Sequence, residues 1–207
     1  MKLRILDAAR LDHPGSVVIV GASCVGKTTL VDELRRANLP GIEIPQRYVT
    51  RAGRSGDHPA ESGPITVEQL QARAGRGELA VWWQRSLEHG RIEHYGFARS
   101  PAGTLPIYSA NNAILTGALP PGVLDRALVI GITAPDAERR ARLLGRSPDL
   151  ARDHPDEVAH RLAERTEDLE PLLHVMVDNC TEHAAVAAAA LVELVRSLDR
   201  ALRMPPK

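Results

Sequence analysis

The chain has 207 residues, and its 26 basic and 26 acidic side chains balance to a net charge of zero at neutral pH. This length can bury one substantial core, so we expect a single domain that carries an inserted flap or lid. Without an overall basic charge or an apolar run long enough to span a bilayer, we predict neither a nucleic-acid nor a membrane partner. Two widely separated cysteines and an N-terminus without an apolar signal region favour a cytoplasmic location.

The first strongly patterned stretch follows a leader, residues 1–15, that we expect to be loose. The apolar run 16–20 predicts a buried strand, and 27–37 continues as an amphipathic helix. Between them, residues 21–28 fit G-x-x-x-x-G-K-[ST], the phosphate-binding P-loop pattern. The glycines let backbone N–H groups turn toward phosphate oxygens, Lys27 reaches the β- and γ-phosphates, and the Thr28 hydroxyl is placed to ligate Mg²⁺. The residues predicted to bind the nucleotide are Gly21, Ala22, Ser23, Cys24, Val25, Gly26, Lys27, Thr28 and Thr29.

A plain glycine turn between a core strand and a helix is the alternative interpretation of this stretch. The strand before it and the helix after it are the context that a true P-loop requires. Only three basic residues are lysines, Lys2, Lys27 and Lys207, and the one away from the termini lies in the motif. We therefore predict nucleotide phosphate binding, with ATP as the expected donor.

Strand-like and helix-like stretches alternate along the rest of the chain. The further predicted strands are 42–44, 46–50, 79–83, 105–110, 126–133 and 173–177. The further predicted helices are 66–76, opened by a capping box of Thr66 and Gln69, and 111–116, 135–144, 156–165 and 182–202, with loops at 52–64, 86–91 and 147–155. This alternation predicts an α/β fold, a parallel sheet with helices on both faces and the P-loop at its carboxyl edge. The apolar stretch 184–195 fits a homodimer interface as well as a core.

Two arginines four residues apart, Arg47 and Arg51, follow the first helix in an extended segment. Planar guanidinium groups suit a second phosphate-bearing molecule, although solvated surface arginines are the alternative. The eight histidines lack metal-ligand spacing, so Thr28 is the metal ligand that we predict.

The order of elements resembles the guanylate kinase-like branch of the nucleoside monophosphate kinases over residues 16–180. Besides the P-loop, the resemblance rests on motifs at 48–51, 77–83, 94–97, 142–146, 161–162 and 177–179. A closer resemblance is to ribose 1,5-bisphosphate phosphokinase, the guanylate kinase-like enzyme of phosphonate catabolism. Its Arg-Tyr-Ile-Thr-Arg is nearly reproduced at 47–51, and its Leu-Ala-Leu-Ser-Trp resembles 79–83.

The resemblance implies one P-loop kinase domain, with a core of 16–45 and 103–207, an acceptor-binding insertion of about 46–102 and a lid of about 146–156. It implies that Arg47, Arg51 and Tyr95 hold the acceptor phosphate. It also implies that Lys27 and three lid-side arginines, Arg142, Arg146 and Arg161, stabilise the charge on the transferred phosphoryl group. Asp178 and Asn179 would lie beside adenine, with a plain turn as the alternative. We interpret Arg139 and Arg140 as a solvated helix face.

Departures from the guanylate kinase pattern concern the acceptor base. Val81 falls where that family carries a guanine-reading Glu, and residues 109–112 contain no acid. Trp82 and Trp83 alternate across a strand, so one should face the core and the other the acceptor cavity, to which we assign Trp83. Asn112 stands where the phosphokinase family has an Arg, and the 83–95 and 146–161 segments are longer than in that family.

We therefore expect an ATP- and Mg²⁺-dependent kinase that phosphorylates a small phosphorylated acceptor, with a ribose 1,5-bisphosphate-like sugar phosphate favoured. One alternative is a nucleoside monophosphate kinase. Another is a hydroxyl kinase that uses Asp32 or Glu43 as its base. A third alternative, of a different class, is a nucleotide-binding module without catalysis.

Overall fold

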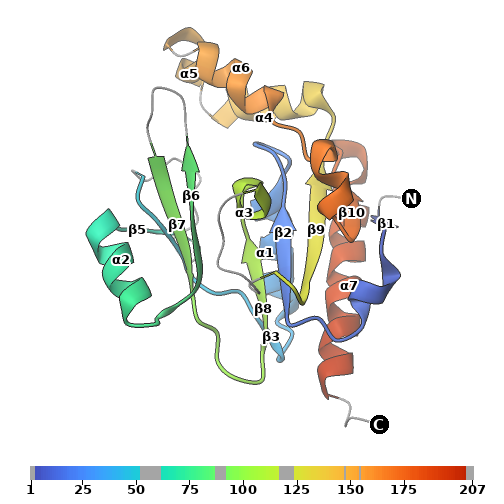
Figure 1. Ribbon diagram of the computed structural model, residues 1–207. Helices are drawn as coiled ribbons and strands as arrows, with labels where there is room; N and C mark the ends of the chain where they lie inside the picture. Colours follow the sequence, from blue (N-terminus) through green and yellow to red (C-terminus); the bar gives the residue numbers. More distant parts are fainter. Residues whose placement is uncertain are drawn as a thin grey trace.

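The protein is described from a computed structural model, which defines residues 3–51, 62–86, 92–116, 124–146, 148–153 and 155–203 (Figure 1). Within these ranges, six strands form the core sheet in the order β1-β10-β9-β2-β8-β3. They are β1 (Leu3–Ile5), β2 (Ser16–Val20), β3 (Ile42–Glu43), β8 (Leu105–Ser109), β9 (Ala127–Thr133) and β10 (Val175–Asp178). Neighbours pair in parallel except for β1, which runs antiparallel to β10. The sheet confirms the predicted α/β fold.

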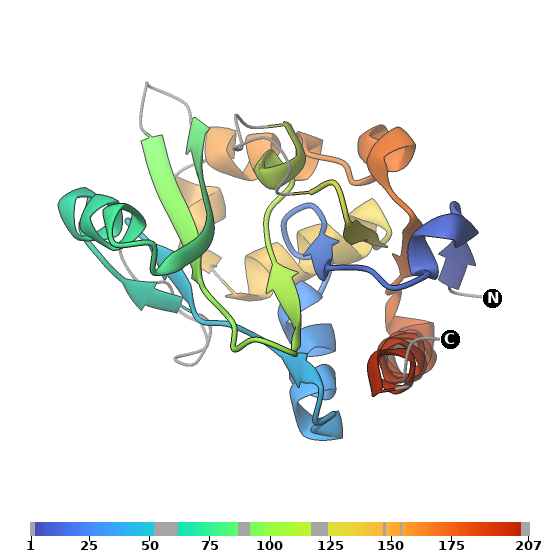
Figure 2. The same ribbon diagram turned by 60° about the horizontal axis from the view of Figure 1, so that its bottom comes forward.

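The two faces of the core sheet are covered differently. Helices α1 (Lys27–Ala37) and α7 (Ala184–Arg203) pack on one face through a shared apolar cluster (Figures 1 and 2). The other face meets the short helix α3 (Ala113–Thr116) and aromatic side chains of the segment inserted between β3 and β8. Because β2 and β9 are buried along their whole length, both read as unbroken apolar runs in the sequence. One face of α7 thus packs in the core, and the homodimer stays a prediction.

Two expectations about irregular segments are wrong. The leader holds β1 and a 3-10 turn, η1 (Ala8–Leu11), whose N-cap Asp7 accepts a hydrogen bond from the backbone of Ala9. β1 forms because the edge of β10 offers it backbone partners, which no local pattern in a three-residue strand reveals. The expected loop at 147–155 contains α5 (Pro148–Asp153), which opens on a proline that is well suited to a first helical turn.

The insertion, which we call the flap, is a second sheet in the order β5-β4-β7-β6. Its elements are β4 (Arg47–Val49), β5 (Ser62–Pro64), α2 (Val67–Gly75), β6 (Leu79–Ser86) and β7 (Ile92–Ala98). The capping box of Thr66 and Gln69 is confirmed. The predicted loops at 52–64 and 86–91 lie mostly outside the described residues. The inner face of the flap carries Trp83, while Trp82 on the outer face is exposed.

The lid side consists of α4 (Asp136–Arg146), α5 and α6 (Pro155–Ala163), followed by the 3-10 turn η3 (Glu167–Leu172). In Figure 1 these helices lie at the top of the molecule, beyond the carboxyl ends of the core strands. A 3-10 turn, η4 (Thr181–His183), leads into α7. Among the residues that the structure describes, no helix has the length and apolarity needed to cross a membrane, and no three His, Cys, Asp or Glu side chains gather as a metal site.

Candidate active site

The P-loop connects the end of β2 to the start of α1. Gly26 precedes the helix with φ of 89°, and a Cβ there would lie 2.2 Å from Nδ2 of Asn179. A Cβ on Gly21 would lie 2.7 Å from the carbonyl oxygen of Ile132, so both motif glycines are required by close approach. Cys24 between them also has a positive φ of 64°. This backbone curl is of the kind that turns N–H groups toward an anion at a helix N-terminus.

Lys27 lies across the loop that precedes it. Its ammonium donates to the carbonyl of Gly21 and, at 3.1 Å, to that of Ala22. The pKa of Lys27 is lowered from 10.5 to about 8, mainly by burial. The charge of Glu164 opposes this shift, and the charge of Arg47 adds to it. Those two residues come from the lid side and the flap, so charges from both parts act on the lysine. Thr28 and Thr29 are exposed in the first turn of α1.

Two buried polar side chains hold the P-loop in place. The Thr166 hydroxyl accepts from the backbone N–H of Ala22 at 3.0 Å and donates to the carbonyl of Ile132 at 2.8 Å. The Asn179 amide donates to the carbonyl of Val25 at 2.8 Å. Asn179 is 4% exposed, so its side chain supports the loop, and adenine contact by Asp178 or Asn179 stays a prediction. The sequence analysis missed Thr166, which lies in no motif.

Arg139 corrects the expectation of a solvated helix face. Its side chain is 2% exposed and its Nε donates to the carbonyl of Ser23 at 3.1 Å. Its other nitrogens donate to the carbonyls of Arg161 at 2.9 Å and Glu164 at 2.8 Å, and to the Asp136 carboxylate at 3.0 Å. The residue ties the P-loop to α4 and to the end of α6. Arg140, one position further, is exposed as expected.

The three predicted lid-side arginines have different surroundings. Arg142 donates to the Glu138 carboxylate at 2.7 Å, to the Asn179 carbonyl at 3.0 Å and to the Cys24 carbonyl at 3.4 Å. Its guanidinium therefore lies against the P-loop. Arg161 is paired with Glu157 and is largely buried, whereas Arg146 is exposed at the end of α4. Arg146 is thus the member of the three whose side chain is open to solvent.

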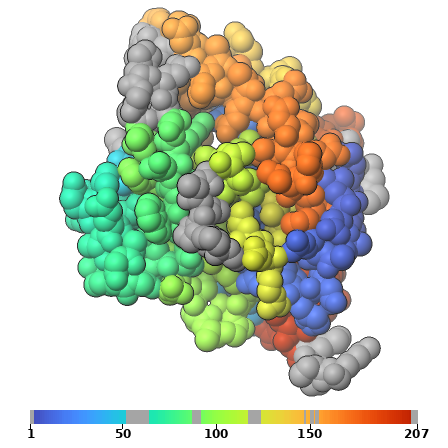
Figure 3. Space-filling model, viewed as in Figure 1, coloured from blue at the N-terminus to red at the C-terminus, as the bar shows by residue number. Residues whose placement is uncertain are grey.

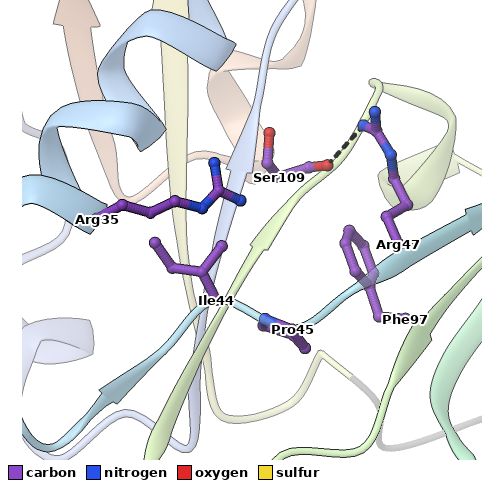
Figure 4. Close-up of a pocket in the computed structure, with 6 residues that line it drawn as sticks. All are labelled: Arg35, Ile44, Pro45, Arg47, Phe97 and Ser109. Atoms are coloured by element: carbon purple, nitrogen blue, oxygen red, sulfur yellow. Dashed lines mark hydrogen bonds between the residues drawn. The ribbon is translucent and has the colours of Figure 1, made fainter. Parts of the chain in front are cut away.

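On the acceptor side, Arg47 extends from β4 toward the end of β8. Its guanidinium donates to the Ser109 carbonyl at 3.1 Å, and Arg35 approaches Ser109 from the opposite side (Figure 4). The cavity between them is only about 10 Å³, enough for about one water molecule. Arg51 lies further along the same segment, half-buried, and its charge acts on Tyr95. Arg47 therefore contacts the end of β8, whereas Arg51 lies near Tyr95.

Tyr95 stands on the inner face of the flap with Trp83. Their rings stack with centroids 5.2 Å apart, and the Tyr95 hydroxyl donates to Glu93, a carboxylate that is 2% exposed. Burial, then this hydrogen bond, raises the pKa of Tyr95. The indole N–H of Trp83 donates to Asn111 at 3.2 Å, which ties the flap to the core. Glu93 is a second site residue that the sequence analysis missed.

A cleft of about 600 Å³ opens between the flap, α3 and α6. In the space-filling view the flap (green) and the lid helices (orange) stand on either side of the hollow (Figure 3). Its polar lining includes Arg85 and Asn112 on one side and His160 and Glu164 on the other. Arg85 and Glu164 form an ion pair at 3.6 Å across it. The cleft is large enough to hold a small molecule.

Comparison with known proteins places this architecture. No protein-family model matches the sequence. A ribose 1,5-bisphosphate phosphokinase PhnN from Pseudofrankia inefficax is 35% identical over 144 residues, which cover 66% of this chain and 70% of that protein. The chain belongs to the PhnN-type, guanylate kinase-like family of P-loop kinases. A guanylate kinase from Corynebacterium efficiens is 30% identical over 90 residues, 43% of this chain and 45% of that protein.

The fold of this PhnN-type kinase also has a structural neighbour. The crystal structure of guanylate kinase from Anaplasma phagocytophilum aligns with a TM-score of 0.56 and 14% identity, covering 94% of this chain and 89% of that one. The likeness shows a shared fold. The shared fold and the sequence relatives together show that the protein is a P-loop phosphotransferase.

In this PhnN-type kinase, the predicted residues are distributed over the P-loop, the flap, the cleft and the lid side. Lys27 and Arg142 contact the P-loop, and Arg47 contacts the end of β8. Trp83 and Tyr95 stack in the buried apolar cluster under the flap, so Trp83 packs in the core and does not line the cleft as predicted, whereas Asn112 does line it. The exposed Arg146 lies at the end of α4. The residues that sequence reasoning missed are Glu93, Arg85, Thr166 and Glu164, none of which stands in a recognised motif.

Proposed function

We propose that the protein transfers the γ-phosphoryl group of ATP to a phosphate oxygen of a small phosphorylated acceptor, and that the acceptor is a ribose 1,5-bisphosphate-like sugar phosphate. The observation that carries the proposal is the position of Arg47. It extends from the flap to the end of β8, and its charge contributes to lowering the pKa of Lys27. An acceptor phosphate that binds Arg47 would therefore lie beside the terminal phosphate of a nucleotide on the P-loop.

The donor half fits a magnesium nucleotide. The P-loop amides and Lys27 would hold the β- and γ-phosphates, and the exposed Thr28 hydroxyl in the first turn of α1 fits a Mg²⁺ ligand. When bound, the ion neutralises phosphate charge during transfer. Thr166, Asn179 and Arg139 fix the loop beforehand, so the N–H groups are preorganised for the anion.

In the transfer step, an acceptor phosphate oxygen forms a bond to the γ-phosphorus while the bond to the β–γ bridging oxygen breaks, and ADP leaves with that electron pair. An acceptor phosphate is already anionic at neutral pH, so no general base is required. Lys27 and Arg47 are placed to stabilise the transferred charge. The exposed Arg146 would join them when the lid side closes, which also excludes water.

Two features support a sugar phosphate over a guanine nucleotide. Val81, at the position of the guanine-reading acid of guanylate kinases, is 3% exposed and packs in the apolar cluster of the flap. The relative with the longest alignment is named as a ribose 1,5-bisphosphate phosphokinase. One observation favours the second candidate, a nucleoside monophosphate kinase. The carboxylate of Glu93 lies beside Tyr95, where it could accept N–H groups of a base.

The deciding experiment measures ADP formation from Mg·ATP with a panel of acceptors. The panel contains ribose 1,5-bisphosphate, other sugar phosphates, GMP, dGMP, AMP, UMP and a set of unphosphorylated alcohols. The expected result is turnover with ribose 1,5-bisphosphate or another sugar phosphate, and none with GMP. Turnover with GMP in preference to every sugar phosphate would instead assign Glu93 as a base reader. Turnover with the unphosphorylated alcohols would replace the phosphate acceptor by a hydroxyl acceptor.

A further inference from the structure

We propose that Arg85, at the tip end of the flap hairpin, binds a phosphate group of the acceptor, and that Glu164 holds its guanidinium in the acceptor-free enzyme. The inference rests on the proposed function in one respect, that the acceptor carries phosphate. It assigns three residues of one cleft: Arg85 binds the acceptor phosphate, Glu164 is the counter-ion of Arg85, and Asn112 binds a hydroxyl group of the acceptor.

The inner face of the β6–β7 hairpin changes character along its length. On β6, Val81, Trp83 and Arg85 alternate with outward-facing residues, and Arg85 is the last of these inner positions. In the strand register, Trp83 lies opposite Tyr95 and Arg85 lies opposite Glu93. The face therefore runs from apolar at its base to charged near its tip. A cation at this inner position, with a side chain 17% exposed, faces the cleft instead of bulk solvent.

The charge of Arg85 reaches both halves of the site. Its charge helps to lower the pKa of Lys27 on the P-loop and opposes the rise in the pKa of Tyr95 on the flap, although burial dominates both groups. Both effects require Arg85 to lie near each residue. Arg85 thus lies near both Lys27 and Tyr95. An anion bound by it would be within the reacting region, and not at a remote part of the flap.

Glu164 is a carboxylate that forms an ion pair with Arg85. Its backbone carbonyl is fixed by Arg139 at 2.8 Å, and its carboxylate lies 3.6 Å from the Arg85 guanidinium. That separation is longer than the roughly 2.8 Å of a strong charge-assisted hydrogen bond. Glu164 also raises the pKa of Lys27, so one carboxylate stands among cations that the proposed function assigns to phosphates. A phosphate that binds bidentately can replace it at Arg85.

Asn112 indicates which other group the phosphate-bearing acceptor carries. It is 7% exposed, lines the same cleft as Arg85, and its amide nitrogen faces the Arg165 carbonyl at 3.5 Å. Its Oδ1 is buried and has no hydrogen-bond donor among the residues that the structure describes. A buried acceptor without a donor carries a free-energy cost that a ligand hydroxyl would remove. Phosphate at Arg85 and hydroxyl at Asn112 together define a hydroxylated phosphate ester, as in a sugar phosphate.

The test compares Arg85→Gln, Glu164→Gln, the double variant and Asn112→Ala. A matched control is Arg76→Gln, which removes another flap arginine that is paired with a carboxylate, Glu78, but lies on the outer side near α2. For each variant we would measure thermal unfolding, KM for ATP, KM for the best sugar phosphate, and the dissociation constant for inorganic phosphate by competition or calorimetry. Inorganic phosphate reports on Arg85 whether or not ribose 1,5-bisphosphate is the substrate.

The expected result is opposite shifts from the two partners of the ion pair. Arg85→Gln should weaken phosphate binding and raise the acceptor KM by about 10- to 100-fold, with KM for ATP changed by less than about twofold. Glu164→Gln should strengthen phosphate binding by about threefold, because it frees Arg85. The double variant should resemble Arg85→Gln. Asn112→Ala should weaken sugar phosphate binding and leave inorganic phosphate binding unchanged.

If the Arg85–Glu164 ion pair has only a structural role, the variants should show a different pattern of affinity changes. If Arg85→Gln and Glu164→Gln shift acceptor affinity in the same direction, or if Arg85→Gln binds inorganic phosphate as the wild type does, the inference is overturned. The proposed function fails separately, by a lack of turnover with every sugar phosphate in the panel. Tight phosphate binding that depends on Arg85 would then still support this inference.

Discussion

The Nε of Arg139 on α4 donates a 3.1 Å hydrogen bond to the carbonyl of Ser23 inside the P-loop. The same guanidinium donates to carbonyls at the end of α6. A single buried cation thus fixes the phosphate-binding loop relative to the lid side of the molecule. The arrangement links the P-loop to the helices beside the cleft, because neither can shift without breaking these bonds.

Replacing Arg139 should destabilise the fold and loosen the P-loop together. Arg139→Met removes the donor for several buried carbonyls, and we expect a loss of about 3–5 kcal/mol in the free energy of unfolding, measured by urea titration. Arg140→Met is the matched control, since Arg140 is exposed on the same helix and should change stability by less than about 0.5 kcal/mol. Equal stability of the two variants would remove Arg139 from this role.

Gly26 and Asn179 should show strong energetic coupling. Gly26→Ala places a Cβ where φ is 89° and 2.2 Å from the Asn179 amide, so we expect a cost of about 1–2 kcal/mol from the backbone, with the clash in addition. Asn179→Ala removes the clash but also the hydrogen bond to Val25. The double variant should therefore lose less stability than the sum of the single losses.

A double-mutant cycle from thermal or urea unfolding measures this coupling. If the losses of unfolding free energy from the two single variants simply add in the double variant, a Cβ at Gly26 does not contact the Asn179 side chain. Gly103→Ala is a useful reference, because Gly103 also has a positive φ, of 83°, with nothing within 4 Å of its Cβ position. It isolates the backbone cost from the clash.

His174 should make stability depend on pH. Its Nδ1 accepts a 2.8 Å hydrogen bond from the backbone N–H of Val129, which requires the unprotonated ring. Burial, then the charge of Arg10, lowers its pKa below 6.5, against an opposing effect of Asp7. The unfolded chain therefore binds a proton more tightly than the folded protein, and this contribution to stability is lost as the pH falls below 6.5.

His174→Gln keeps a neutral acceptor and should reduce the slope of unfolding free energy against pH between about 7 and 5. The difference between wild type and variant isolates this residue from the carboxylates, which titrate lower. Parallel stability curves for the two proteins across that interval would exclude a role for His174. His160→Gln, in the cleft, provides a histidine control.

Local pattern was sufficient where one segment determines its own structure. The buried run of β2, the P-loop and the start of α1 at Lys27 were predicted residue by residue, as was the capping box at Thr66. These signals are short-range: apolar periodicity, glycine conformations and side chains that bond their own helix end. The same signals missed β1, which exists only because β10 provides an edge to pair with.

The site shows the same division. Lys27 and Arg47 were predicted because motifs mark them, but the surroundings of Arg139 depend on carbonyls from two other segments. Nothing in the run of arginines on α4 distinguishes the buried Arg139 from the exposed Arg140. Likewise, Glu93 and Arg85 gain significance only when the hairpin register sets them opposite each other beside Tyr95. Such long-range juxtaposition is outside the reach of a single sequence.

Arg146 should affect turnover without affecting the fold. It is exposed at the C-terminal end of α4, unlike Arg142 and Arg161, which are held by carboxylates. If it approaches the transferred phosphoryl group on closure, Arg146→Ala should lower kcat by about 10²-fold or more, with an unchanged KM for ATP and a melting temperature within about 1 °C of wild type. Steady-state kinetics and thermal unfolding check both parts, with Arg140→Ala as a control from the same helix. Wild-type turnover by Arg146→Ala would exclude the residue from charge stabilisation, and Arg142, already against the P-loop, would be the remaining lid-side cation close to the donor.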